Sequence, residues 1–133
     1  MKVIVTGSRE FADRELLRRV LSDLYDEAYP NNGVILVHGA CPTGADKHAA
    51  EWARDRQNGP YWASNVMVFP YPANWGHGKG AGMARNAEMV NAGANLVLAF
   101  FQPGAANKGT AGCVKLARRA GIEVREYGRE VSS

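Results

Sequence analysis

The sequence predicts an α/β protein that consists of one domain, built on an open parallel sheet of about five strands with helices on both faces. Short runs of β-branched and large apolar residues alternate along the chain with segments of helical periodicity. These runs are apolar at consecutive positions, which is typical of parallel strands buried on both faces. A length of 133 residues suffices for one core and is too short for two, so we expect a single domain over residues 1–133.

The first predicted helix shows the clearest periodicity. Between residues 13 and 28, Leu17, Leu21 and Leu24 recur at helical spacing, and Asp13 is in position to be the N-cap. Gly121 is in position to end the last helix. The expected strands are residues 2–6, 34–38, 66–69, 96–101 and 122–125, and the other helices are residues 43–57, 80–91 and 109–120. Each helix follows a strand, so the crossovers are right-handed and a ligand is expected at the carboxyl ends of the strands.

The charged residues are distributed unevenly. The chain has 16 Lys and Arg against 13 Asp and Glu, a net charge of +3, but residues 1–66 carry −1 and residues 67–133 carry +4. Within residues 67–122 the only acid is Glu88, against six basic residues. This balance favours a small phosphate-bearing ligand, and it disfavours nucleic-acid wrapping, which requires a denser basic stripe.

Several classes of protein lack support in the sequence. No apolar run approaches the roughly 20 residues of a membrane span, and the N-terminus enters the first strand instead of a signal-peptide core, so we expect a cytoplasmic protein without membrane contact. Cys41 and Cys113 have no paired spacing and are expected to be reduced thiols. His38, His48 and His77 lack metal-ligand spacing, so no metal site and no cofactor is predicted.

Two loops at the predicted carboxyl edge contain glycines beside potential ligand-binding groups. After the first strand, Gly7 lets backbone N–H groups approach an anion, and Ser8 and Arg9 can donate to phosphate oxygens. Taken alone, that segment favours an ordinary strand-to-helix turn with a solvated Arg. After the second strand, Gly39 and residues 42–44 lead tightly into a helix N-terminus that favours negative charge. Asp46 there either complements the helix dipole or contacts ribose hydroxyls, and the sequence does not choose between these roles.

A third loop, residues 76–86, has four glycines in seven positions before a helix. It satisfies neither the Walker A pattern nor the dinucleotide-binding pattern, which disfavours ATPase and hydride-transfer chemistry. It does bring Gly82, Arg85 and Asn86 to the start of a helix, where they can hold a phosphate or a sugar, although an exposed helical Arg is the alternative. The adjacent Trp75 is the best candidate for stacking on a base, although packing is the commoner use of tryptophan.

A fourth loop, residues 103–110, ends in Lys108, Gly109 and Thr110 at another predicted helix N-terminus. Together the four segments resemble the YspA/YpsA-related branch of the SLOG superfamily, through VTGSR (5–9), HG (38–39) with TGAD (43–46), AGMARNAEM (81–89) and KGT (108–110). The resemblance covers nearly the whole chain. It implies a Rossmann-like nucleotide-binding domain, with relatives that include Lonely Guy (LOG) phosphoribohydrolases, the DNA-processing protein DprA and sensors of ADP-ribose or cyclic nucleotides. A homo-oligomer is also consistent with the resemblance.

The sequence departs from the LOG pattern at the catalytic glutamate. LOG enzymes carry a Pro-Gly-Gly-x-Gly-Thr-x-x-Glu loop, and the expected Glu here falls on Cys113. A thiol does not do the work of a carboxylate in glycosidic cleavage. Asp46 or Glu88 from another loop would have to replace it. Whether the protein is an enzyme is therefore left open.

The sequence thus predicts a module that binds a nucleotide or nucleotide-sugar, similar to AMP or ADP-ribose, at the carboxyl edge of the sheet as a sensor or sequestering protein. The alternatives are an N-glycosidic hydrolase of the LOG type and a DprA-like binder of single-stranded DNA. The expected ligand-binding residues are Thr6, Gly7, Ser8, Arg9, Gly39, Gly44, Asp46, Gly82, Arg85, Asn86, Gly109 and Thr110.

Overall fold

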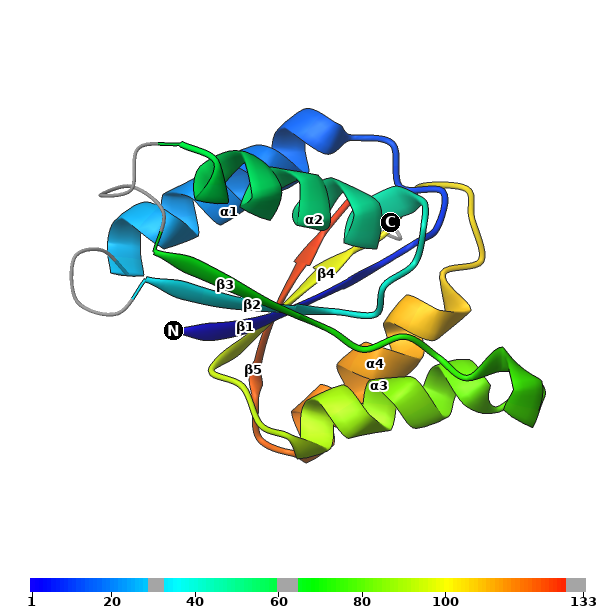
Figure 1. The fold of residues 1–133 in the computed structure, drawn as a ribbon. Helices are drawn as coiled ribbons and strands as arrows, with labels where there is room; N and C mark the ends of the chain where they lie inside the picture. The colour runs from blue at the N-terminus through cyan, green and yellow to red at the C-terminus, as the bar shows by residue number, and fades with distance from the viewer. Residues whose placement is uncertain (29–32, 60–64, 129–133) are drawn as a thin grey trace, which may run out of the picture.

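A computed structural model describes residues 1–28, 33–59 and 65–128. It confirms the predicted α/β class, with one five-stranded, all-parallel sheet of strand order β3-β2-β1-β4-β5 (Figure 1). The strands are β1 (Lys2–Gly7), β2 (Val34–His38), β3 (Val66–Pro70), β4 (Leu96–Phe100) and β5 (Glu123–Tyr127). The helices are α1 (Arg14–Ala28), α2 (Gly44–Gln57), α3 (Ala81–Asn91) and α4 (Lys108–Arg119), with a short 3₁₀ helix η2 (Trp75–His77).

The central strand β1 is buried on both faces. Val3 and Val5 join the core formed with α1 and α2, while Ile4 between them joins the core formed with α3 and α4. Helices α1 and α2 lie on one face of the sheet, and α3 and α4 lie on the other (Figure 1). The period-two alternation along an all-apolar strand therefore serves two cores at once.

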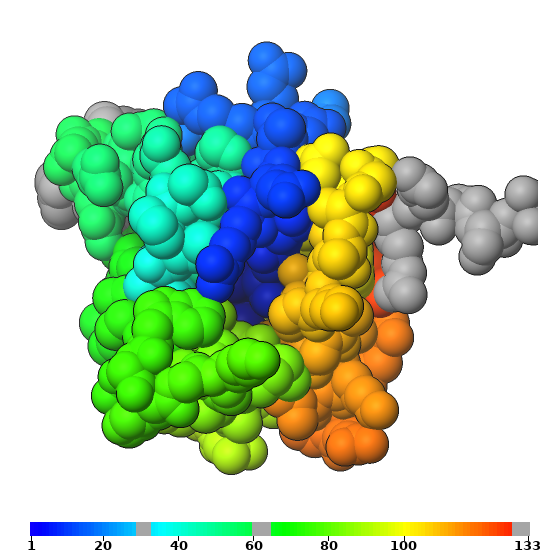
Figure 2. Space-filling view, turned by 90° about the vertical axis from the view of Figure 1, so that its right-hand side faces the viewer, coloured from blue at the N-terminus to red at the C-terminus, as the bar shows by residue number. Residues whose placement is uncertain are grey.

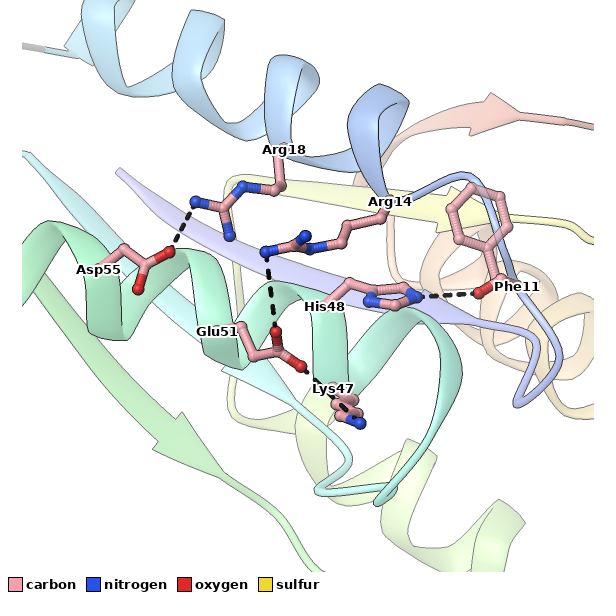
Figure 3. Close-up of polar contacts among 7 residues, drawn as sticks. All are labelled: Phe11, Arg14, Arg18, Lys47, His48, Glu51 and Asp55. Atoms are coloured by element: carbon pink, nitrogen blue, oxygen red, sulfur yellow. Dashed lines mark hydrogen bonds and ion pairs between the residues drawn. The ribbon is translucent and has the colours of Figure 1, made fainter.

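The contact between α1 and α2 has an apolar centre and a polar margin. Leu17, Leu21 and Trp52 belong to the same buried cluster. At the margin, Arg18 pairs with Asp55 at 2.7 Å and Arg14 pairs with Glu51 at 4.0 Å (Figure 3). Exposed ion pairs contribute about 0–1 kcal/mol, so apolar burial determines the stability of this layer.

The ends of the elements follow local sequence signals. The predicted cap of α1 is confirmed, because the carboxylate of Asp13 accepts the N–H of Leu16 at 3.1 Å. The predicted terminal glycine of α4 is confirmed as well. Gly121 has φ +77°, and the N–H of Ile122 donates to the carbonyl of Ala117 at 3.0 Å. Because this cap uses Ile122, β5 begins one residue later than predicted, at Glu123.

The strand order creates a crevice at one edge of the sheet. From β1 the chain moves through β2 to β3 on one side, and then crosses to β4 on the other side of β1. The loops after β1 and β4 therefore diverge, which is where ligands bind in open α/β sheets. Within the described part of the chain, no helix combines the length and apolarity that crossing a bilayer requires.

Candidate functional site

A cleft of ≈ 760 Å³ lies at the carboxyl edge of the sheet. Figure 2 shows this edge, with the end of β1 in blue recessed between the cyan loop after β2, the green segment around η2 and the yellow to orange segment that enters α4. Eleven of the twelve residues predicted from the sequence line this cleft. They are Thr6, Gly7, Ser8, Arg9, Gly39, Asp46, Gly82, Arg85, Asn86, Gly109 and Thr110.

The floor of the cleft is the end of β1. Gly7 has no room for a side chain, because a Cβ there would overlap Ala45 of α2 and approach the Phe100 carbonyl to 2.8 Å. The N–H of Ser8 donates to that same carbonyl at 3.0 Å, and the Ser8 hydroxyl accepts the N–H of Glu10 at 3.0 Å. A hydroxyl that accepts this bond still has its own proton to donate toward the cleft.

Gly44 is the predicted site residue that does not line the cleft. It adopts φ +71°, and a Cβ would overlap the carbonyl of Ser8. The next residue, Ala45, donates its N–H to that carbonyl at 3.2 Å. Gly44 therefore lets the start of α2 pack against the loop after β1, which positions the cleft walls.

A buried carboxyl group faces a guanidinium across the loop after β2. The Asp46 side chain accepts the N–H of Cys41 at 3.2 Å, and the residue is 7% exposed. Burial raises the pKa of Asp46 to about 6, although the N–H of Cys41 and the charge of Arg85 oppose the shift. Burial thus keeps a proton on Asp46 up to a higher pH than on an exposed aspartate.

Arg85 is held across this loop. Its Nη1 donates to the carbonyl of Gly39, and its Nε donates to the side-chain oxygen of Asn86 at 2.8 Å. A Cβ at Gly39 would overlap the guanidinium, so a glycine is required there. These two bonds use two of the five N–H donors of the guanidinium. The structure thus places Arg85 at the cleft, with guanidinium donors that these two bonds do not use.

Asn86 links two helices. Its side-chain nitrogen donates to the carbonyl of Gly109 at 3.2 Å, and the residue is 3% exposed. Its amide is committed at both ends, to Arg85 and to α4. Asn86 lines the cleft, but its contacts are those of a residue that positions other groups.

Helix α4 begins at the cleft without a side-chain cap. Asn107 at the N-cap has φ 53°, and its side chain bonds to Gln102 instead, accepting its N–H at 3.0 Å and donating to its carbonyl at 2.9 Å. The first turn contains no acid and begins with Lys108. Helix α3 likewise begins without a side-chain cap or an acid in its first turn. Backbone N–H groups at such helix starts favour anions.

The rim of the cleft has features that the sequence only partly indicated. The Arg9 guanidinium lies 5.0 Å from the centroid of the Trp75 ring, which is 56% exposed. Pro42, Met83 and Asn107 line the cleft as well. Nothing in the residue types of Pro42 and Met83 predicted this, because their position depends on how the loops meet. Asn107 had a usable signal, since asparagine tolerates a left-handed conformation before a helix.

Comparison with known proteins shows the family of the chain. The family model described as YspA, cpYpsA-related SLOG family matches residues 1–78. The Gene 61 protein of Mycobacterium phage D29 is 42% identical over 130 residues, which is 96% of each chain. The chain belongs to the YspA, cpYpsA-related SLOG family. SLOG membership is consistent with a nucleotide-related role.

In this SLOG protein, Cys113, where the LOG pattern predicted a glutamate, belongs to the buried core and is not among the cleft-lining residues. Cys113 is fully buried, and burial raises the pKa of its thiol although the side chain of Thr6 opposes the shift. Glu88 is exposed and is not among the cleft-lining residues, whereas Asp46 is. Of the two replacement carboxylates that the sequence offered, the structure brings only Asp46 to the cleft. In the described residues, no group of three or more His, Cys, Asp or Glu side chains is arranged to hold a metal ion.

Proposed function

We propose that this SLOG protein binds a nucleotide or nucleotide-sugar of the AMP or ADP-ribose type in the cleft, as a sensor or sequestering module. The observation that carries this proposal is the convergence of positive groups. Helices α3 and α4 both begin at the cleft with no side-chain cap and no acid in the first turn. Four basic side chains line the cleft against two acidic ones: Arg9, Lys79, Arg85 and Lys108 against Glu10 and Asp46.

The phosphate binds at the start of α4. The backbone N–H of Gly109, the hydroxyl of Thr110 and the hydroxyl of Ser8 are its donors, with the remaining guanidinium donors of Arg85. The ribose hydroxyls bind Asp46, because a carboxylate is a strong acceptor for them. A cleft of ≈ 760 Å³ is within the range of pockets that hold small molecules.

A thermal-shift panel of AMP, ADP-ribose, NAD and ribose 5-phosphate tests the proposal, because ligands of the native state raise the unfolding temperature. We expect at least one nucleotide to stabilise the protein. Replacing Arg85 with Ala should then weaken its binding by about 1.5–3 kcal/mol, as for a hydrogen bond to a charged group. Arg119→Ala, at the exposed far end of α4, is the matched control.

Two results would contradict the proposal. No stabilisation by any nucleotide would reject the binding function, and equal losses for both arginine variants would remove Arg85 from the site. Binding of a single-stranded DNA oligomer that falls by roughly 0.7 log units per log unit of salt for each phosphate neutralised would favour the DNA-binding alternative.

The state of Asp46 supports a second candidate function, hydrolysis of the N-glycosidic bond of a bound nucleotide. A carboxyl group with a pKa of about 6 can both donate and accept a proton near neutral pH. Asp46 gives its proton to the leaving base, the bond from C1′ to the base nitrogen breaks, and water supplies the hydroxyl at C1′ and restores the proton. Chromatography of AMP, NAD and ADP-ribose after incubation should then reveal free base with the wild type and none with Asp46→Asn. Binding without base release would support the sensor function instead.

A further inference from the structure

Two large apolar side chains are exposed at the rim of the cleft. Trp75 is 56% exposed and Met83 is 43% exposed, and both line the cleft. Single exposed apolar side chains are common on proteins, but two large ones beside a cleft mark a place where an apolar or aromatic group binds. The contacts proposed above for phosphate and ribose do not use either side chain.

The indole ring is held in place. On one face lies the guanidinium of Arg9, whose Cζ is 5.0 Å from the ring centroid. At the ring edge lies Gly82 of α3, where a Cβ would come within 3.3 Å of Trp75 Cη2. The turn that carries the ring is itself closed, because the Asn74 side chain accepts the N–H of Gly76 at 3.2 Å. The Gly82 contact and the closed turn do not involve the ring face that Arg9 covers, so they keep the ring as a preformed surface, which lowers the entropic cost of stacking on it.

We infer that Trp75 is the stacking platform for the nucleobase, and that Arg9 occupies the place of the base when the cleft is empty. This inference rests on the nucleotide function proposed above. A guanidinium and a nucleobase are both flat groups that stack on an indole. A cation–π contact at an exposed site is weaker than the stacking of a base on an aromatic ring, so the base displaces the guanidinium. Arg9 then turns toward the phosphate, which is the stronger partner for its charge.

The surroundings of the ring indicate how selective the platform is. Six described residues between positions 72 and 83 line the cleft: Pro72, Ala73, Trp75, Lys79, Gly82 and Met83. Apart from the indole itself, only Lys79 and Met83 among these six have side chains that form hydrogen bonds. Lys79 is a donor only, and the Met83 thioether is a weak acceptor that already accepts the side-chain N–H of Asn86 at 3.9 Å. Stacking without hydrogen bonds to the base edge tolerates every base. The ligand class is therefore any nucleotide with a 5′-phosphate and an attached base, and the base identity is secondary.

The test compares ligands with and without a base by calorimetry. AMP, GMP, CMP and UMP should bind the wild type within about tenfold of one another. Ribose 5-phosphate should bind about 5- to 150-fold more weakly than AMP, which corresponds to the loss of one base stacked on an aromatic ring. Trp75→Ala should lose the same factor for AMP without weakening the binding of ribose 5-phosphate, while Trp75→Phe retains most of the AMP affinity.

Phe69→Ala is the control, because Phe69 is a similarly exposed aromatic residue on β3 that does not line the cleft. Equal affinities of the wild type for AMP and ribose 5-phosphate would overturn the inference and leave the proposed function standing, as would a Trp75→Ala variant with wild-type AMP affinity. If the wild type binds neither compound, the proposed function fails and the platform fails with it.

Discussion

Helices α1 and α4 both follow strands near the centre of the sheet, yet they begin in opposite ways. Helix α1 has Asp13 as its cap, with a bond of 3.1 Å to the N–H of Leu16, and it has Glu15 in the first turn. Helix α4 has no side-chain cap, no acid in the first turn, and Asn107 turned away toward Gln102. The first helix start lies outside the cleft and the second lines it.

This difference indicates that the start of α1 contributes to stability and the start of α4 to binding. At α1 the helix N–H groups and dipole are neutralised within the chain, which stabilises the fold. At α4 the same groups are left for an external anion. The start of α4 therefore lacks the stabilisation that a cap and an acid provide, at the place where we propose the phosphate binds. Helix α2 is intermediate, since it lacks a side-chain cap bond but has the buried Asp46 in its first turn.

The largest expected effect comes from making α4 resemble α1. Gly109→Asp places a carboxylate in the first turn of α4, where a Cβ meets no atom within 4 Å. Two like charges about 4 Å apart repel by roughly 4 kcal/mol at an effective dielectric constant of 20, so nucleotide affinity should fall on the order of 100-fold or more. The unfolding temperature should not fall, because an acid is favourable at a helix start. Gly109→Asn, which adds the same bulk without charge, should bind within a few-fold of the wild type, and equal losses for Asp and Asn would contradict the comparison.

The next largest effect concerns Asp46, the acidic residue in the first turn of α2. The pKa of Asp46 is raised from 3.8 to about 6 in the folded state, so the folded protein binds this proton more tightly than the unfolded chain. Its contribution to stability is therefore fully present below pH 3.8 and is lost as the pH rises through 6, by on the order of 2–3 kcal/mol. The free energy of unfolding of Asp46→Asn, measured with denaturant, should not show this decrease as the pH rises. A constant stability difference between the two proteins from pH 4 to 7 would show that the pKa is not raised.

A smaller effect is expected at the start of α1, where Asp13 already caps the helix. Asp13→Ala removes the cap and should lower the free energy of unfolding by about 1 kcal/mol. Nucleotide affinity should stay unchanged, because Asp13 is outside the cleft. Denaturant unfolding and calorimetry on the same variant measure both quantities, and a loss of affinity would mean that the two helix starts are not independent.

The smallest effect concerns the exposed Lys108 at the start of α4. Lys108→Gln should weaken nucleotide binding by about 0.3–1 kcal/mol at low salt, because surface charges near a helix end contribute little. The difference should shrink as the salt concentration rises, since screening acts on exposed charges. A loss that persists at 1 M salt would instead indicate a direct and partly buried contact with the ligand.

Local sequence predicted the fold well because local physics decides its elements. Consecutive apolar residues in β1, an N-cap at Asp13 and a terminal glycine at Gly121 act within a few residues of the chain. The departures are equally local: β5 begins at Glu123 because the preceding residue takes part in a helix cap. The convergence of the four glycine-containing segments was also predictable, because a parallel sheet brings every carboxyl end to one edge.

The roles of the individual cleft residues were harder to predict from the sequence. Gly39 is needed because the Arg85 guanidinium packs against it, and Gly44 because the Ser8 carbonyl does. Asn86 joins Arg85 to α4. These contacts join segments far apart in the sequence, so neither residue type nor spacing reveals them.

The sequence by itself determined the order of strands and helices, the loops that carry glycines and basic residues, and the family. The tertiary structure decided which of those residues face the cleft, which support it, and that Asp46 is buried enough to raise its pKa to about 6. The physical reason is the distance along the chain over which each interaction acts. Backbone preferences and caps act between neighbours, whereas desolvation and packing depend on every segment that the fold brings close.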